Sequence, residues 1–354
     1  MKSRTAGFQI PVDFYLTQHD LPLFRLPNNL ELELQFAKIS PHLGRKRYVK
    51  NLLNNNPSIS IKDFEILNVI GRGGYSKVVW GRKRDSGKLY AIKIMDKVDI
   101  LNELISARIV INEWSIQMMF KDDPFFLNLY WTFQDQEHFY LVTELWIGGN
   151  LFHLLTTHRA LDESTARFYA WEILIMLQKL HEHNVIYRDL KPENILIDAE
   201  GHLKLADFGL AKVVNSLNDL NETFWGSPEY MSPEMLFGDT HNMTLDFYTF
   251  GWLIYEMVTE FPPFYWENKQ EMNRSIMYGK LNLSKLSKEL NHLLKWLLSR
   301  SKWNRPSSIE EIMSHPFFNK VNWDMIRNKK ITPPWIPSLI NHFNPKLTKI
   351  PIIK

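Results

Sequence analysis

The chain of 354 residues is long enough for a two-lobed enzyme or for two modest domains with extensions. Its hydrophobic content of 45% and aromatic content of 13% indicate a globular core and exclude a disordered polymer. The net charge of +3 points to no class of partner, and the absence of cysteine excludes disulfides, thiolate metal sites and cysteine nucleophiles.

The start of the chain has no apolar core of signal-peptide length, and no segment approaches the roughly 18 apolar residues of a membrane span. We therefore expect a soluble protein inside the cell, in the cytoplasm, the nucleus or both. Residues 319–354 hold seven Lys or Arg and one Asp, so this tail carries +6 and the rest of the chain −3. The tail and the basic cluster at 45–50 could contact a membrane surface or nucleic acid, but such charge runs are usually solvated faces.

A meander of strands is the first structure that the pattern predicts. Residues 1–57 carry scattered prolines and end in three asparagines and Pro57, which is typical of an extension followed by a linker. Short apolar alternations then follow, separated by turn residues as in an antiparallel meander. The strands are predicted over 64–70, 77–80 and 89–94, with turns at 71–74 and 85–87.

Helical patterns dominate the later part of the chain. Residues 162–183 repeat apolar side chains at helical spacing behind Asp162, a plausible N-cap. Residues 245–259 are apolar nearly all round, which indicates a helix buried on every side. A small β-rich half therefore precedes a larger helical half, and a nucleotide cleft between them is the natural site for a ligand.

A glycine-rich segment, Gly71-Arg72-Gly73-Gly74, places residues without side chains where backbone amides could approach phosphates. A glycine-rich hairpin with no ligand has the same pattern, so this segment alone is weak evidence. A Rossmann motif fits less well, because another strand rather than a helix follows Val78.

Three further motifs follow in order. Lys93, fifteen residues after Val78, lies in an apolar strand that could aim its cation at phosphates; a lysine on an exposed strand edge is the alternative. The run from Tyr187 to Asn194, Tyr-Arg-Asp-Leu-Lys-Pro-Glu-Asn, supplies a base, a cation and a metal-binding amide. The Asp-Phe-Gly sequence that starts at Asp207 supplies a carboxylate for magnesium. In this order, the motifs match the signature of protein kinases.

From about residue 60 to 318, the chain resembles a protein kinase, and it most resembles the AGC group, which includes the cyclic-AMP-dependent kinase. Lys191 beside the catalytic aspartate is similar to serine/threonine kinases and unlike tyrosine kinases. The features typical of the AGC group are Tyr187 before Arg188-Asp189, the segment Thr223-Phe-Trp-Gly-Ser-Pro-Glu-Tyr230, Pro262-Pro263-Phe264, and His315-Pro316-Phe317-Phe318 with Trp323 behind it.

This resemblance implies an α+β, bilobal protein-kinase fold, with a small antiparallel β-rich N-lobe that contains one long helix and a larger, mainly helical C-lobe. It also implies transfer of the γ-phosphoryl group of ATP to serine or threonine of protein substrates, with Mg²⁺. The implied division is an extension and linker at 1–57, the N-lobe at 58–145, the C-lobe at 146–318 and an AGC-like basic tail at 319–354.

The resemblance assigns the catalytic roles by position. Asp189 would accept or orient the substrate hydroxyl proton, and Lys191 would steady the moving phosphoryl group. Asn194 and Asp207 would bind magnesium through hard oxygen ligands. Glu113 would pair with Lys93; Glu103 is the rival partner, although it follows the strand too soon.

It also implies an ATP site. The apolar residues at its walls could equally be plain core residues, and the two interpretations are compatible because adenine would complete that core. The implied contacts are Gly71, Arg72, Gly73 and Gly74 under the phosphates, Val78 and Ala91 above adenine, Leu151 and Leu196 below it, the backbone at Glu144 and Trp146 along its edge, and Thr143 as gatekeeper.

Regulation and substrate choice are implied in the same way. Thr223 would be a regulatory phosphorylation site, open to an upstream activating kinase, with Arg188 and Lys212 pinning the phosphate. Glu193 and Glu256 would read basic residues upstream of the acceptor, beside a substrate-facing Ser227. Glu234 and Arg305 match a buried, structural ion pair.

The match is incomplete at a few positions. Ser76 replaces the third glycine of the loop, and Asn150 stands where basophilic members have a glutamate. Gln117, one turn after Glu113, replaces an apolar residue, and a buried amide without a partner would weaken the active form. A weakly active enzyme or a pseudokinase scaffold is therefore the alternative function, although the retained catalytic residues oppose it.

Overall fold

The computed structural model describes residues 59–337, apart from 73–75, 99–112, 147 and 222–227. All of the described residues belong to one compact unit that begins at Asn56. None of the helices within these described ranges combines the length and the apolar character needed to cross a membrane.

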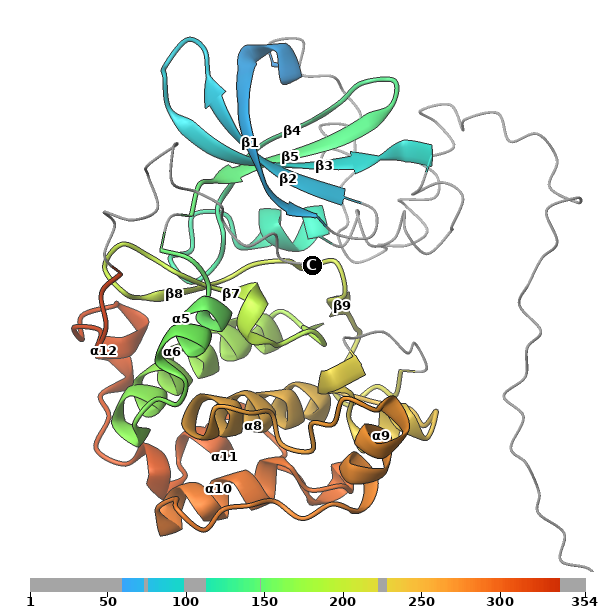
Figure 1. Ribbon diagram of the computed structural model, residues 1–354, viewed down its shortest axis with the longest axis vertical. Coiled ribbons are helices and arrows are strands. Elements are labelled where there is room, and N and C mark those ends of the chain that lie inside the picture. Colours follow the sequence, from blue (N-terminus) through green and yellow to red (C-terminus); the bar gives the residue numbers. More distant parts are fainter. Residues whose placement is uncertain (1–58, 73–75, 99–112, 147, 222–227, 338–354) are drawn as a thin grey trace, which may run out of the picture. The chain divides into compact units, whose positions relative to one another are not determined.

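A five-stranded antiparallel sheet forms the first part of this unit (Figure 1). The three strands predicted from the alternation are present, and the structure adds a further hairpin, β4–β5. The order across the sheet is β1-β2-β3-β5-β4. The bounds are β1 (Phe64–Arg72), β2 (Ser76–Lys83), β3 (Leu89–Asp96), β4 (Leu129–Gln134) and β5 (His138–Glu144).

The pleat of β3 explains how a lysine can lie in an apolar strand. Successive side chains point to opposite faces of a sheet. Ile92 and Ile94 are buried in a small core with residues of the neighbouring strands. Ala91 and Lys93 point to the other face, where both are only partly buried. The alternation therefore directs Lys93 away from this core.

Helices form the second part of the unit (Figure 1). The Asp162 carboxylate caps α6 by accepting hydrogen bonds from the backbone of Ser164 and Thr165, at 2.9 and 3.0 Å. Helix α8 is buried from Thr244 to Met257, which confirms the all-round apolar pattern. The bounds are α5 (Leu151–His158), α6 (Glu163–Glu182), α7 (Pro233–Leu236), α8 (Thr244–Thr259), α9 (Lys269–Tyr278), α10 (Lys288–Leu297), α11 (Ile309–Met313) and α12 (Trp323–Arg327).

Two small ladders hold the loops that carry the predicted chemistry. One pairs β6 (Val185–Ile186) with β9 (Lys212–Val213), and the other pairs β7 (Ile195–Ile197) with β8 (Leu203–Leu205). The loop from β6 to β7 contains the run 187–194, and the loop from β8 to β9 contains 206–211. Since each loop is tied at both ends, its side chains occupy defined positions.

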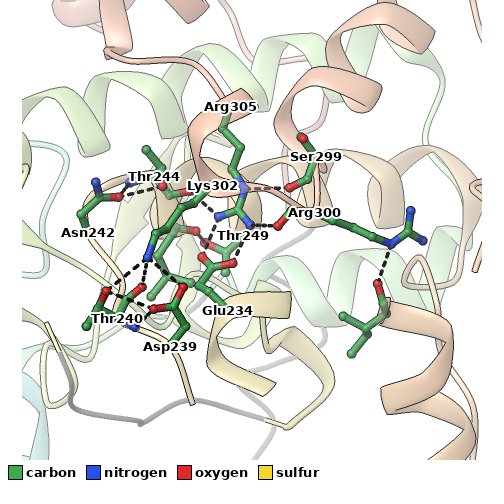
Figure 2. Close-up of polar contacts among 12 residues, drawn as sticks. Glu234, Asp239, Thr240, Asn242, Thr244, Thr249, Ser299, Arg300, Lys302 and Arg305 are labelled. Atoms are coloured by element: carbon green, nitrogen blue, oxygen red, sulfur yellow. Dashed lines mark hydrogen bonds and ion pairs between the residues drawn. The ribbon is translucent and has the colours of Figure 1, made fainter. Parts of the chain in front are cut away.

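A buried ion pair joins α7 to the segment before α11, as the sequence predicted. The Arg305 guanidinium donates to both Glu234 carboxylate oxygens, from Nη1 to Oε1 at 2.7 Å and from Nη2 to Oε2 at 2.6 Å (Figure 2). Arg305 also donates to the backbone carbonyls of Ser299 and Thr244. The pair therefore joins elements about 70 residues apart in the chain.

Candidate active site

An ion pair positions the strand lysine. Lys93 Nζ lies 2.7 Å from both carboxylate oxygens of Glu113, in the helical stretch 113–119. The rival partner, Glu103, falls outside the described residues. Lys93 Nζ also lies 3.5 Å from Asp207 Oδ1, so the sheet lysine faces the loop that follows β8.

The charges of these three groups support one another. Burial disfavours the charged lysine, but the carboxylates of Asp207 and Glu113 outweigh it and raise the pKa of Lys93. The Lys93 cation holds the pKa of Asp207 below its usual value, against burial. Burial raises the pKa of Glu113, with Lys93 opposing the rise. Lys93 is thus a fixed cation, and Asp207 is an ionised carboxylate at neutral pH.

Asp189 lies at the centre of the loop between β6 and β7. Its Oδ2 accepts hydrogen bonds from Lys191 Nζ and Asn194 Nδ2, each at 2.8 Å, and its backbone carbonyl accepts a second bond from Asn194 at 2.9 Å. Burial raises the pKa of Asp189, while Lys191 and Asn194 oppose the rise. A carboxylate whose pKa moves toward the working pH suits a general base.

Asp246, at the start of α8, anchors this loop from below. Its buried carboxylate accepts from the backbone N–H of Tyr187 at 2.9 Å and of Arg188 at 2.8 Å, and it lies 2.8 Å from His181 Nε2. The sequence analysis missed this residue. The available signal was an acid inside an otherwise apolar helix, which is costly unless the acid has partners.

Arg188 and Asp207 both adopt positive φ angles, 69° and 54°. This conformation costs a residue other than glycine about 1–3 kcal/mol, and residues strained in this way are often found at functional sites. The Arg188 backbone is held by the hydrogen bond from its N–H to Asp246 Oδ1. At Asp207, the side-chain Oδ1 accepts a hydrogen bond from the Gly209 N–H at 3.3 Å.

Asn194 and Asp207 fit a magnesium ion. The Asn194 amide nitrogen donates twice to Asp189, which leaves Oδ1 as the acceptor end, and the Asp207 side chain is 49% exposed. Magnesium in nucleotide sites usually takes one or two carboxylates together with phosphate oxygens. The described residues contain no cluster of three His, Cys, Asp or Glu that could hold a metal by itself.

The residues predicted to line the adenine site have partly exposed side chains. Val78, Ala91 and Leu196 are only partly buried, whereas Val79 and Ile92 beside them in the sheet are fully covered. Val78 lies opposite Lys93 in the register of β2 and β3, and Ala91 lies opposite Thr143 in β3 and β5. Leu151 is fully buried in the helical core, so we do not retain it below adenine.

The segment after β5 is fixed by a second lysine. Glu144 Oε1 accepts from the backbone of Asn128 at 2.8 Å and from Lys204 Nζ at 2.6 Å, and Lys204 Nζ lies 5.0 Å from the centre of the Trp146 ring.

The structure describes only part of the predicted phosphate loop. Gly71 pairs with Val78, and the Arg72 backbone pairs with Lys77, in the register of β1 and β2. Gly73 and Gly74 lie outside the described residues.

Comparison with known proteins agrees with this geometry. The family model for the protein kinase domain matches residues 64–318. The chain belongs to the protein kinase family. It is 38% identical to the serine/threonine-protein kinase Sgk1 of Rattus norvegicus (91% of this chain, 76% of the relative) and 36% identical to Sgk1 of Homo sapiens (99% and 85%). It is 40% identical to the serine/threonine-protein kinase gad8 of Schizosaccharomyces pombe (81% and 50%).

These relatives confirm the prediction of an AGC serine/threonine kinase with the bilobal kinase fold. The family implies ATP as a substrate and typically magnesium. The sheet ends at Glu144 and α5 begins at Leu151. The division of the two lobes between residues 145 and 146 stays a prediction.

Two acids were predicted to read basic residues of a substrate: Glu193, in the loop between β6 and β7, and Glu256, in α8. Glu256 is buried and accepts a hydrogen bond from the Tyr230 hydroxyl at 2.9 Å. Burial raises the pKa of Glu256 to about 7 and also raises the pKa of Glu193. Glu193 Oε2 is buried and has no hydrogen-bond partner among the described residues. Such a carboxylate suits a cation supplied by a substrate.

Both ends of the Asn150 side-chain amide make hydrogen bonds within the kinase domain. Its Oδ1 caps α5 by accepting from the backbone of His153 at 3.0 Å, and its Nδ2 donates to the Glu193 carbonyl at 3.2 Å. An amide in this position adds no negative charge for a basic substrate.

The cations predicted to pin a phosphate belong to adjoining segments. Arg188 Nε donates to the Leu210 carbonyl at 2.7 Å, and Lys212 pairs with Ile186 in the ladder of β6 and β9. Their predicted target, Thr223, lies outside the described residues, as does Ser227.

Gln117, which replaces an apolar residue of the family, is buried. Its side chain is 3% exposed, and its Oε1 has no hydrogen-bond partner among the described residues. It lies one helical turn after Glu113, the partner of Lys93. An unsatisfied buried amide costs about 1–3 kcal/mol, which acts against the helix position that holds Glu113.

Gln117→Leu is therefore expected to raise the free energy of unfolding by about 1–3 kcal/mol and to raise kcat, because the unpaired oxygen is removed. Denaturant unfolding and steady-state kinetics measure both effects. Gln270→Leu, the same change at an exposed position of α9, is the control and is expected to change neither. An unchanged or lower stability of Gln117→Leu would show that the amide has a partner.

Proposed function

We propose that this serine/threonine kinase transfers the γ-phosphoryl group of ATP, bound with Mg²⁺, to protein substrates that carry basic residues upstream of the acceptor. The observation that carries the proposal is the short distance between two side chains that come from different parts of the fold. Lys93, held by Glu113 in the sheet region, lies 3.5 Å from Asp207, which follows β8 in the helical region. Asp189 is held beside Lys191 and Asn194.

Each residue has a task that its surroundings favour. Lys93 would bind phosphate oxygens as a fixed cation, since Glu113 prevents it from swinging away. Asn194 and Asp207 would hold magnesium, which when bound offsets the charge of the phosphates. Asp189 would accept or orient the proton of the substrate hydroxyl, and Lys191 would stay close to the transferred group.

Val78, Ala91 and Leu196 would sandwich adenine, whose edge would bond the backbone at Glu144 and Trp146, with Thr143 behind it. The partial exposure of the three apolar side chains supports this arrangement. The alternative of a pseudokinase scaffold is opposed by the assembled set of Lys93, Glu113, Asp189, Asn194 and Asp207.

We propose an intracellular setting for this activity, in the cytoplasm, the nucleus or both. Lys329, one of the basic residues of the tail, contacts other residues of the fold. Its Nζ donates to the Leu203 carbonyl at 3.0 Å and lies 3.6 Å from Asp198.

The preference for basic substrates is expected to depend on pH. The pKa of Glu256 is about 7, so the carboxyl is ionised above this pH and becomes protonated below it, while arginine stays charged throughout. Between pH 8 and pH 6, the KM for a peptide with upstream arginine should rise about tenfold. The KM for the same peptide with alanine in that position should change little.

Glu256→Gln is expected to raise the KM of the arginine peptide at pH 8 and to remove this pH dependence. Glu271→Gln, at an exposed position of α9, is the matched control. Equal phosphorylation of acidic and basic peptides by the wild-type kinase would refute the assigned preference.

Phosphorylation of Thr223 by an upstream kinase is expected to activate the enzyme. A phosphate there brings nearly two negative charges and three acceptor oxygens toward Arg188 and Lys212. Each charge-assisted hydrogen bond contributes about 1.5–3 kcal/mol, so Thr223→Ala should lower kcat by about tenfold or more. Mass spectrometry must first confirm that the wild type carries the phosphate. A fully active wild type without it, or unchanged turnover in the variant, would contradict this regulation.

A further inference from the structure

The hydrogen bonds of the His315 ring show which of its nitrogens carries the proton. His315 is the N-cap of the short helical turn η6 (Pro316–Phe318), and its Nδ1 accepts a hydrogen bond from the Phe317 backbone N–H at 3.2 Å. A backbone N–H can only donate, so His315 Nδ1 carries no proton. A neutral imidazole has one N–H and one bare nitrogen, and the proton of His315 is therefore on Nε2.

The same argument applies to the neighbouring ring of His292, in α10. His315 Nε2 lies 2.8 Å from His292 Nδ1. Because His315 Nε2 carries the proton, it donates this hydrogen bond and His292 Nδ1 accepts it. The proton of His292 is then on Nε2, and both rings are neutral. One chain of hydrogen bonds thus runs from the Phe317 backbone through His315 to His292.

This chain of hydrogen bonds leaves no place for a further proton between the rings. On His292 Nδ1, an added proton would face the N–H of His315 at a nitrogen separation of 2.8 Å. On His315 Nδ1, it would face the N–H of Phe317. Protonation of either ring at these atoms therefore breaks one of the two hydrogen bonds and leaves a donor without its acceptor, which is costly for a buried group.

Burial also favours a neutral His315. Its side chain is among the buried polar groups, with 5% exposure, and the centre of its ring lies 6.0 Å from that of Trp296. Burial lowers the pKa of His315 and the neighbouring His292 lowers it further, while Glu289 opposes the shift.

Charged side chains from three helices lie around the histidine pair. Glu289 and Lys295 are on α10, Glu311 is on α11, and Arg167 of α6 packs on the Phe317 ring of η6. Lys295 and Glu311 line a groove of about 610 Å³ together with both histidines, so protons from solvent can reach the pair. The two acids and two cations balance, so they supply no excess of negative charge to stabilise a protonated ring.

The pair joins α10 to a turn that is part of the core. Phe317 and Phe318 of η6 are each 1% exposed and belong to the hydrophobic core of the helical part. The Arg167 guanidinium lies 4.7 Å from the centre of the Phe317 ring and so connects η6 to α6. A change at the pair therefore acts on the packing of this core.

We propose that His292 and His315 form a pH-sensitive contact, which closes α10 onto η6 while both rings are neutral and opens when the pair takes up a proton from solvent in mildly acidic conditions. In the unfolded chain, histidine takes up a proton with a pKa of about 6.5. The folded pair takes it up only at lower pH. Its contribution to stability is therefore complete above about pH 6.5 and is lost as the pH falls below this value.

Nitrogen-15 NMR of the full chain with labelled histidine tests the arrangement of protons directly. The two signals are assigned by their loss in His292→Asn and His315→Asn. At pH 7.5, we expect two neutral rings that both carry their proton on Nε2. A charged ring at this pH, or a His315 with its proton on Nδ1, would overturn the proposal without any need for a stable variant.

Thermal unfolding at pH 7.5 and 5.5 tests the effect on stability. The Tm of the wild type should fall between these values, and the fall should be smaller by about 2 °C in His315→Asn, because asparagine can cap η6 without taking up a proton. It should also be smaller in His292→Asn, whose side-chain oxygen can accept from His315 Nε2 and does not titrate. His158→Gln, at an exposed position of α5, is the control and should behave as the wild type does.

The combination of variants separates the pair from a single buried histidine. Smaller falls in both His315→Asn and His292→Asn support the pair. A smaller fall in His315→Asn alone would show that only the buried ring is linked to stability, and the proposed contact would be refuted. Falls equal to that of the wild type in both variants would refute any role of these histidines in the pH dependence.

Discussion

Asp207→Asn is expected to lower kcat by about three orders of magnitude. A metal ion contributes several kcal/mol of charge stabilisation in such reactions, and each 1.36 kcal/mol is a factor of ten in rate. The wild-type carboxylate is ionised because Lys93 holds its pKa low, and an amide cannot replace this charge toward magnesium. Steady-state kinetics at several magnesium concentrations measure the effect.

The control for this experiment is Asp85→Asn, the same loss of charge in an exposed turn of the sheet. Its turnover should equal that of the wild type. Thermal unfolding of both variants separates a catalytic loss from a folding defect. Retention of wild-type turnover by Asp207→Asn would remove Asp207 from the metal site.

Arg305→Met is expected to lower the free energy of unfolding by about 3–5 kcal/mol, because it leaves the Glu234 carboxylate buried without its partner. The Glu234 and Arg305 side chains are almost inaccessible to solvent. The guanidinium also donates hydrogen bonds to backbone carbonyls of α8 and of the segment 299–300 (Figure 2). Lys302 adds a second tie nearby, with Nζ 3.1 Å from Asp239 Oδ2.

The double variant Glu234→Met/Arg305→Met should recover part of the stability, since the isolated charge is gone. Arg327→Met is the control, because its pair with Asp324 is exposed and should contribute less than about 1 kcal/mol. Denaturant unfolding of the three variants and the wild type measures these contributions. An Arg305→Met variant as stable as the wild type would show that the pair contributes nothing.

The sequence by itself determined the family, the fold class and most of the candidate site. Its motifs lie in short runs whose order and spacing are local properties, so Lys93, Asp189, Asn194 and Asp207 could be named without coordinates. The alternation of strands and the Asp162 cap are equally local, since backbone periodicity fixes them within a few residues. All of these elements appear in the structure.

Only the tertiary structure decided which distant groups meet. Asp246 binds the backbone of the catalytic loop 58 residues earlier in the chain, and no local pattern encodes that contact. Among the described residues, the Gln117 Oε1 atom and the His241 ring nitrogens have no hydrogen-bond partner. This too depends on the tertiary structure, because burial and hydrogen bonding involve every element packed around a side chain. Leu151 was placed below adenine for its apolar character alone. In the structure it is fully buried in the core of the helical part, so it has no surface left for adenine.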